Sequence, residues 1–230
     1  MVSIPDHADI LITNAYLITM DPSRRVFQTG AIAIKNGRII GIGADRVVAT
    51  QFKADKSIDA AGSAVHPGFI DNHNHLCLHN MRWAYPELPD PYHTPDPKAK
   101  SYWDLCADEI EYTGSKLASL EMARNGTTCF LEAGTLTTPD AGAKAIEDIG
   151  IRGILGDPFI FDVHEASVPM IERYPFDPQR AFNSLGSELH RNRHSDALVK
   201  GHVNLRGMAS ASAELELAAV ALAQEHGVVL

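Results

Sequence analysis

The sequence predicts an α/β fold in which a small β module is followed by a parallel sheet with helical connections. Two observations predict it. Short segments rich in Ile and Leu, separated by turn residues, fill residues 8–65. From residue 69 onward, strand patterns alternate with helix patterns, which is typical of βαβ units. We therefore expect two parts, residues 1–66 and residues 67–230.

The first part contains two partly alternating strand segments, ADILITNAYLITM and GAIAIKNGRIIGIG. In the second of them, Asn36-Gly37 lies where a tight two-residue hairpin turn is favoured. The segment SIDAAGSAV adds another short strand and turn. Nothing in this part is typical of a catalytic site.

The second part reads as four βα units and the first residues of a fifth strand. The predicted strands are GFIDNHNH, TTCFLEAG, IRGILGD and ALVKGHVNLRG. The predicted helices span about residues 103–125, the segment PDAGAKAIEDIG, about residues 179–194, and AELELAAVALAQEH. Gly126 is a plausible cap of the first helix, and Ser212 and Gly227 flank the last. The apolar ending VVL favours a chain that is cut in mid-fold.

His73 and His75 lie at the end of the first strand of the second part. Residues two apart on a strand point to the same face, so both imidazoles project together. They do so at the carboxyl end of the strand, the edge where parallel α/β folds bind ligands. The pair can take two positions of one metal ion, although zinc needs at least three protein ligands. Two hydrogen-bonded structural histidines are the alternative.

The segment VHPGFIDNHNHL closely resembles the Pro-Gly-Phe-Ile/Val-Asp-x-His-x-His signature of the amidohydrolase superfamily of metal-dependent hydrolases. Three further regions are similar to parts of this superfamily: ILITNAYLITMD with IAIKNGRIIGIG to its N-terminal β-sandwich, ASLEMARNGTTCFLEAG to its second unit and GIRGILG to its third strand. The segment SASAELELAAVALAQEHGVVL resembles the one before the fifth strand in the deaminase and chlorohydrolase branch, which includes guanine deaminase, adenosylhomocysteine/methylthioadenosine deaminase and the triazine hydrolases. The resemblance implies a partial (β/α)8 TIM barrel over residues 67–230, truncated at the start of strand five, behind an N-terminal β-sandwich.

The same resemblance implies that His73 and His75 bind one Zn²⁺ per active site, with Fe²⁺ as the alternative. The other ligands would be a His on strand five, a His on strand six and an Asp on strand eight. The acid/base Glu would follow the strand-five His, so all of these would lie beyond Leu230. The implied reaction is hydrolytic deamination of an amino-substituted nitrogen heterocycle by a metal-activated water. Dechlorination and cyclic-amide hydrolysis are alternatives, as is an inactive fragment or assembly module.

Arg206, His79 and Arg82 are the candidates for substrate contact. Arg206 shares the polar face of the fourth strand and falls where guanine deaminase-like sequences have a substrate-contacting Arg; a structural ion pair is the alternative. His79 and Arg82 follow the histidine pair and either contact substrate or brace the loop. Lys200, on the same face as Arg206, is a weaker candidate for a carboxylated Lys that bridges two metals.

The remaining polar candidates favour structural roles. Glu132 is expected to form a salt bridge, and Cys77 to be buried rather than nucleophilic. His190 and His194, four residues apart on a predicted helix, are expected to lie on a solvated face. The proline-rich loop at residues 84–97 is a candidate lid, and Trp83 and Tyr92 are candidate stacking surfaces for a flat heterocycle.

Composition restricts the partners. The formal net charge of −9 provides no basic field for nucleic acid or an anionic membrane surface. No apolar run approaches the ~20 residues of a membrane span, and three scattered cysteines fit a reduced compartment. We expect a cytoplasmic protein that acts on a small heterocyclic molecule and is a homo-oligomer when full length.

Overall fold

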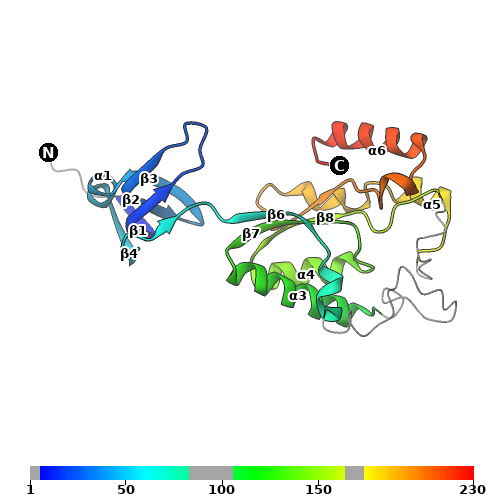
Figure 1. Ribbon diagram of the computed structural model, residues 1–230, viewed down its shortest axis with the longest axis horizontal. Coiled ribbons are helices and arrows are strands. Elements are labelled where there is room, and N and C mark those ends of the chain that lie inside the picture. The colour runs from blue at the N-terminus through cyan, green and yellow to red at the C-terminus, as the bar shows by residue number, and fades with distance from the viewer. Residues whose placement is uncertain (1–5, 83–105, 164–173) are drawn as a thin grey trace. The chain divides into compact units, whose positions relative to one another are not determined.

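The computed structural model describes residues 6–82, 106–163 and 174–230. The chain divides into two compact units, Met1–Pro67 and Gly68–Leu230 (Figure 1). None of the helices in the described residues has both the length and the hydrophobicity that a membrane span requires.

The N-terminal unit is built on one five-stranded sheet. Its strands are β1 (Asp6–Ile18), β2 (Val26–Lys35), β3 (Arg38–Ala44), β4 (Phe52–Asp59) and β5 (Ala64–Val65). Their order is β3-β2-β1-β4, and β5 pairs with β1. The predicted hairpin turn is confirmed: Asn36 and Gly37 both have positive φ, 51° and 70°, as a type I′ turn requires. The sequence did not predict helix α1 (Asp45–Gln51), whose Val48 is buried against strand residues.

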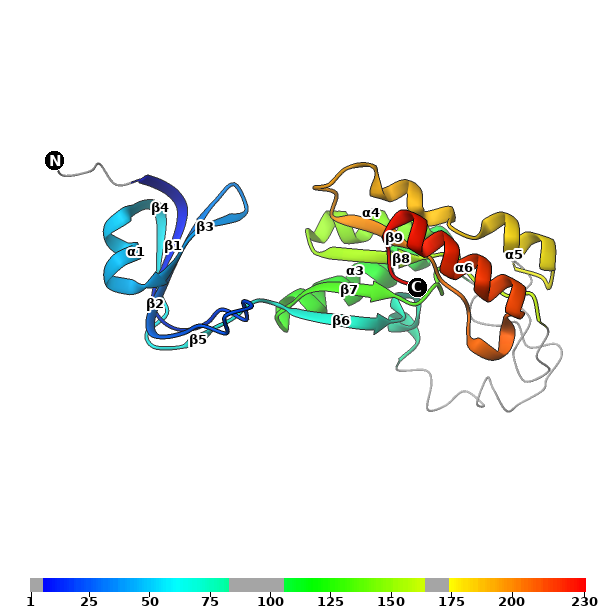
Figure 2. The same ribbon diagram turned by 90° about the horizontal axis from the view of Figure 1, so that it is seen from above.

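The C-terminal unit is built on a four-stranded sheet that confirms the predicted parallel arrangement. The strands are β6 (Phe69–Asn74), β7 (Thr127–Glu132), β8 (Arg152–Gly156) and β9 (Val199–His202), in that order. The helical segments are η1 (Leu76–Met81), α3 (Asp108–Arg124), α4 (Pro139–Ile149), α5 (Pro178–Ser184), η2 (Ser187–Arg193), η3 (Met208–Ser210) and α6 (Ala213–His226). Figures 1 and 2 show the strands running in one direction, so their carboxyl ends share one edge.

Helices α3 and α4 lie together along the sheet, and α6 lies on the opposite side of it in the view of Figure 1. The largest hydrophobic cluster joins α3 and α4 to the strands, with Phe130, Ile146, Leu155 and Phe159 almost completely buried, whereas α6 packs through two smaller clusters. Burial of each such side chain stabilises the fold by about 1.5–3 kcal/mol. This core holds the sheet edge in place, and the polar groups described below stand on that edge.

Several predicted element boundaries are wrong. Helix α3 begins at Asp108 rather than near residue 103. The fourth strand, β9, ends at His202 instead of continuing toward Gly207. Val228–Leu230 form no strand, although VVL was predicted to begin a fifth one. By contrast, Ser212 caps α6 as predicted, accepting a hydrogen bond from the Leu215 amide at 3.2 Å.

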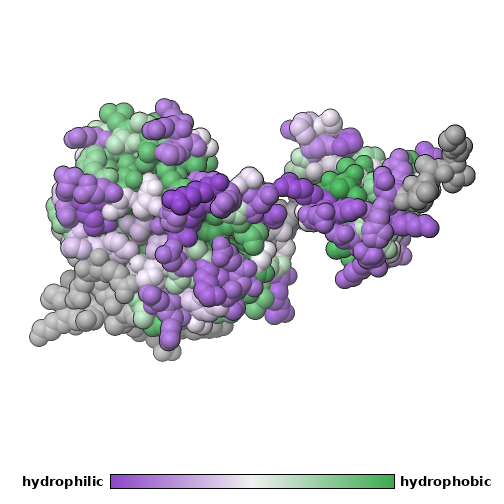
Figure 3. Space-filling view, turned by 180° about the vertical axis from the view of Figure 1, so that it is seen from behind, coloured by the Kyte–Doolittle hydropathy of each residue, from purple (hydrophilic) through white to green (hydrophobic). Residues whose placement is uncertain are grey.

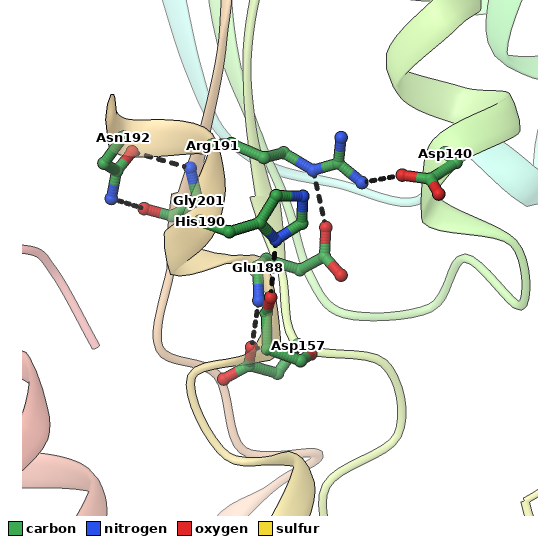
Figure 4. Close-up of polar contacts among 8 residues, drawn as sticks. Asp140, Asp157, Glu188, His190, Arg191, Asn192 and Gly201 are labelled. Atoms are coloured by element: carbon green, nitrogen blue, oxygen red, sulfur yellow. Dashed lines mark hydrogen bonds and ion pairs between the residues drawn. The ribbon is translucent and has the colours of Figure 1, made fainter. Parts of the chain in front are cut away.

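The predicted helix over residues 179–194 is two segments, α5 and η2, because Gly186 between them has a left-handed φ of 79°. The buried Asp157 carboxylate after β8 accepts hydrogen bonds from the amides of Gly186 and Glu188, at 2.7 and 3.0 Å. Glu188 in turn binds Arg191, which also reaches Asp140 on α4 (Figure 4). These polar contacts tie η2 to the end of the sheet and replace the backbone hydrogen bonds of a continuous helix.

Candidate metal centre

His73 and His75 bring two ring nitrogens to one point at the carboxyl end of β6. His73 is the fifth residue of that strand, and His75 directly follows the strand and precedes η1. Their Nε2 atoms are 3.1 Å apart, and the ring planes meet at 77°. Tetrahedral zinc with Zn–N bonds of about 2.0–2.1 Å holds two ligand nitrogens about 3.3 Å apart. The spacing of the pair therefore fits two positions in the coordination shell of one ion.

His75 is the more enclosed of the two rings. Burial, followed by the neighbouring His73, lowers the pKa of His75 below the ordinary histidine value. A neutral imidazole is the form that coordinates a metal, so this environment suits a ligand. The Nδ1 atom of His75 lies 2.9 Å from the Thr135 hydroxyl, on the far side of the ring from Nε2.

An open pocket of about 270 Å³ surrounds the pair, and it is lined by His73, Asn74, His75, Leu78, His79 and Arg82. The structure thus brings four of the predicted site residues together. Arg206 is not among the described residues that line this pocket. The predicted lid at residues 84–97, Trp83 and Tyr92 lie outside the described residues.

Arg82 and His79 both face Glu121 of α3. Arg82 forms a two-pronged salt bridge with the Glu121 carboxylate, with both N···O distances at 2.5 Å. His79 Nε2 lies 4.0 Å from the same carboxylate. Burial, followed by the Arg82 charge, lowers the pKa of His79, whereas the hydrogen bond from Arg82 lowers the pKa of Glu121. Arg82 therefore braces η1 against α3, one of the two roles considered from the sequence.

Arg206 lies beyond the end of β9, since the strand stops at His202. Its backbone amide donates to the Ile160 carbonyl at 2.9 Å. The guanidinium carbon lies 5.2 Å from the Phe161 ring centre, within the range of a cation–π contact. Lys200 donates a hydrogen bond to the carbonyl of His194 in the loop that precedes β9.

Glu132, expected to form a salt bridge, is instead fully buried at the end of β7. Its carboxylate accepts hydrogen bonds from the Gly134 amide at 2.8 Å, the Thr135 amide at 3.0 Å and the Thr135 hydroxyl at 2.6 Å. Burial raises the pKa of Glu132 to about 7, and these hydrogen bonds only partly oppose it. Sequence reasoning missed the contact of Thr135 with His75. The sequence Glu-Ala-Gly-Thr at the end of a predicted strand could have indicated this turn, because an acidic side chain there can accept hydrogen bonds from the amides that follow it.

The other candidates from the sequence lie outside the pocket, as expected for structural residues. His190 and His194 are exposed, and His190 Nδ1 bonds the Ser187 carbonyl at 2.7 Å, while Cys77 is buried. A separate group on the N-terminal unit places ligand atoms within 4.8 Å of one another. Its members are His7, Asp9 and Asp55. All three are exposed, and exposed acidic groups of this kind are common without an ion.

Comparison with known proteins supplies a family context for this geometry. The model of the amidohydrolase family matches residues 64–230. The chain is 39% identical over 152 residues to 5′-deoxyadenosine deaminase of Methanosarcina mazei, covering 64% of this chain and 33% of that protein. It is 34% identical over 154 residues to 5-methylthioadenosine/S-adenosylhomocysteine deaminase of Syntrophobacter fumaroxidans, covering 65% and 34%. The matched segment thus spans about a third of the length of these relatives.

A solved structure shows the same fold. The crystal structure of an adenosine deaminase from Xanthomonas campestris with bound zinc matches with a TM-score of 0.75 and 20% sequence identity. The match covers 98% of this chain and 49% of that chain. At this identity the likeness establishes the fold and leaves the chemistry to be argued from the site.

Proposed function

Because the chain belongs to the amidohydrolase family, we propose that His73 and His75 are two ligands of a catalytic metal ion, Zn²⁺ with Fe²⁺ as the alternative. The observation that carries this proposal is the 3.1 Å separation of the two Nε2 atoms at the carboxyl edge of a parallel sheet. Zinc requires at least three protein ligands, so groups other than this pair complete the coordination.

We propose that residues 67–230 are the first half of a (β/α)8 barrel, and that the whole protein hydrolyses carbon–nitrogen bonds other than peptide bonds. Two relatives are named for the deamination of 5′-deoxyadenosine and of 5-methylthioadenosine or S-adenosylhomocysteine. Their names favour deamination of the adenine ring of a 5′-modified adenosine. A bound zinc ion would supply hydroxide near neutral pH, because it lowers the pKa of water to about 7.

The residues of this chain would contribute binding and orientation. His73 and His75 would hold the ion, and the pocket beside them would receive the substrate. His79 lines that pocket and would offer a neutral ring nitrogen to a polar group of the substrate, because burial and Arg82 lower its pKa. Arg82 would act mainly through its salt bridge, which fixes the segment that carries His79. Arg206, which follows β9 at the other side of the four-stranded sheet, remains a candidate for substrate contact.

The test is the metal content of the whole protein together with its release of ammonia from 5′-deoxyadenosine. His73→Ala and His75→Ala should each lower bound zinc and turnover in parallel. His190→Ala is the matched control, because His190 is exposed and lies outside the pocket. Unchanged bound zinc and turnover in the double variant would overturn the proposal.

A second candidate is a non-catalytic assembly module, which exposed hydrophobic groups favour. On β6, which pairs only with β7 among the described strands, Phe69 and Ile70 are 57% and 73% exposed. Figure 3 shows a hydrophobic area over the α6 end of the unit, where Leu217 is 71% exposed. Metal-free, self-associating material would support this candidate, whereas one equivalent of zinc with turnover would refute it. A cytoplasmic location and a homo-oligomeric whole protein are further predictions of the enzyme proposal.

A further inference from the structure

Thr135 connects the inner side of the metal pair to a buried acid. Its hydroxyl oxygen lies 2.9 Å from His75 Nδ1 and 2.6 Å from Glu132 Oε1. Glu132 is fully buried, and the metal-binding role proposed for the histidines leaves it without an assigned task. The row Glu132–Thr135–His75 joins the ends of two neighbouring strands, β7 and β6.

The hydrogen bonds in this row have a direction. A threonine hydroxyl carries one proton and can accept two hydrogen bonds. Its shortest contact is with the Glu132 carboxylate, and a charge-assisted bond of this kind is the stronger partner for the proton. Once that proton points to Glu132, the threonine oxygen can only accept from His75. His75 then carries its own proton on Nδ1, and the lone pair on Nε2 is free.

This tautomer of His75 also agrees with the contact that its Nε2 atom makes with His73. His75 Nε2 lies 3.1 Å from His73 Nε2, so one of these atoms donates and the other accepts when no ion separates them. With the proton of His75 on Nδ1, His73 is the donor. A metal ion that binds between the rings must displace the Nε2 proton of His73, whereas His75 is already in its ligand form.

The backbone that carries Thr135 is held from both neighbouring strands. The Ala133 amide donates to the Asn74 carbonyl of β6 at 3.0 Å, and the Phe159 amide after β8 donates to the Gly134 carbonyl at 3.0 Å. Gly134 has a φ of +70°, and a Cβ atom there would lie 2.0 Å from the Asn204 side-chain nitrogen. The turn is therefore hydrogen-bonded on both sides and closely packed, and it holds Thr135 beside the imidazole.

We propose that Thr135, held by the carboxylate of Glu132, is a positioning residue that fixes His75 as the Nδ1-protonated tautomer and so presents Nε2 to the metal. The inference rests on the proposed function in taking Nε2 as the ligand atom. The tautomer itself is a property of the metal-free chain. Substitution of a residue that hydrogen-bonds to a metal-binding histidine typically lowers metal affinity 10–100-fold.

The direct test is nitrogen NMR of the metal-free 230-residue chain labelled with ¹⁵N in its histidines. Spectra are recorded at about pH 8, where neutral imidazoles report their tautomer, and His75 is assigned by comparison with His75→Gln. The expected result is a protonated Nδ1 and an unprotonated Nε2 for His75, with the opposite pattern for His73. A protonated Nε2 on His75 in the unsubstituted chain overturns the proposal.

Three substitutions separate positioning from general support of the fold. Thr135→Val removes the acceptor and should shift His75 toward the Nε2-protonated form and weaken zinc binding 10–100-fold. Thr135→Ser keeps the hydroxyl and should retain both the tautomer and the affinity. Thr113→Val, the same change at an exposed position on α3, is the matched control and should alter neither.

Glu132→Gln should reverse the direction of the hydrogen bonds in the row Glu132–Thr135–His75. At the position of Oε2 its oxygen can accept from the amides of both Gly134 and Thr135, which lie at 2.8 and 3.2 Å, so its amide nitrogen would donate to the Thr135 hydroxyl from the position of Oε1. The threonine proton would then turn to His75 Nδ1 and leave the proton of that ring on Nε2. A Glu132→Gln chain that keeps the Nδ1-protonated tautomer would contradict the role of Glu132.

Zinc titration of the whole protein, which supplies the further ligands, distinguishes failure of this inference from failure of the proposed function. If zinc binding is absent, or is insensitive to His73→Ala and His75→Ala, the proposed function fails, whatever the tautomer. If zinc binding depends on both histidines but equals the wild-type value in Thr135→Val, the positioning role fails and the metal site stands.

Discussion

Glu132 should make the stability of the C-terminal unit fall as the pH rises. Its folded-state pKa is raised to about 7 from 4.5, with burial as the largest cause. The folded chain therefore binds this proton more tightly than the unfolded chain. The resulting stabilisation is fully present below about pH 4.5 and is lost as the pH rises through about 7. At 1.36 kcal/mol per pKa unit, the difference of about 2.5 units corresponds to about 3 kcal/mol.

Glu132→Gln measures this contribution, because glutamine has a similar shape and does not ionise. Wild type and variant are unfolded in urea with a chelator present, and far-ultraviolet circular dichroism is followed. Between pH 5 and pH 8 the unfolding free energy of wild type should fall by about 2–3 kcal/mol relative to the variant.

Burial also raises the pKa of the Asp157 and Glu188 carboxyl groups. Both groups are present in wild type and variant, so their contributions to the unfolding free energy cancel in this difference. Glu147→Gln, at an exposed position on α4, controls for removal of a surface carboxylate. A difference between wild type and Glu132→Gln that stays constant within about 0.5 kcal/mol over this pH range would refute the buried, perturbed state of Glu132.

Three further substitutions test the frame around the site by urea unfolding. Gly134→Ala should destabilise by at least about 2 kcal/mol, because the left-handed φ costs about 1–2 kcal/mol and the new Cβ meets the Asn204 side chain at 2.0 Å; wild-type stability would show that the turn can open. Ser212→Ala should cost about 0.5–2 kcal/mol through the lost cap of α6, and no loss of stability or helical circular dichroism would exclude that role. Arg191→Met should cost about 3–5 kcal/mol because it leaves the nearly buried Glu188 without its cation, and Arg191→Lys should recover part of that loss. A cost below about 1 kcal/mol for Arg191→Met would show that Glu188 is solvated.

The elements that the sequence predicted well are those whose signals are local. The Asn36-Gly37 turn depends on two residues that tolerate positive φ. The last helix depends on Ser212 at its start and Gly227, with a φ of 62°, after its end. The prediction of a single helix over residues 179–194 was wrong because the signal that interrupts it is not local. Its interruption depends on the Asp157 carboxylate, about 30 residues earlier in the chain, and no local pattern announces that contact.

The histidine pair could be predicted because its geometry needs only the alternation of one strand end. The support beneath it could not be predicted in the same way, because Thr135 follows His75 by 60 residues. Their contact requires β6 and β7 to pair in one register, with Asn74 opposite Glu132. A shift of one residue would turn Glu132 to the other face of the sheet and separate Thr135 from the ring.

Arg206 shows where extrapolation along a strand ends. Its expected face assumed that alternation continues from Lys200, but pairing with β8 stops at the Gly156–His202 pair. Beyond that pair the backbone is held by the loop after β8, through the bond from the Arg206 amide to the Ile160 carbonyl. The direction of Arg206 is therefore set by that loop and by the Phe161 ring beside its guanidinium. A role for Arg206 in binding must then involve the loop as well, so changes at Phe161 should affect substrate binding together with changes at Arg206.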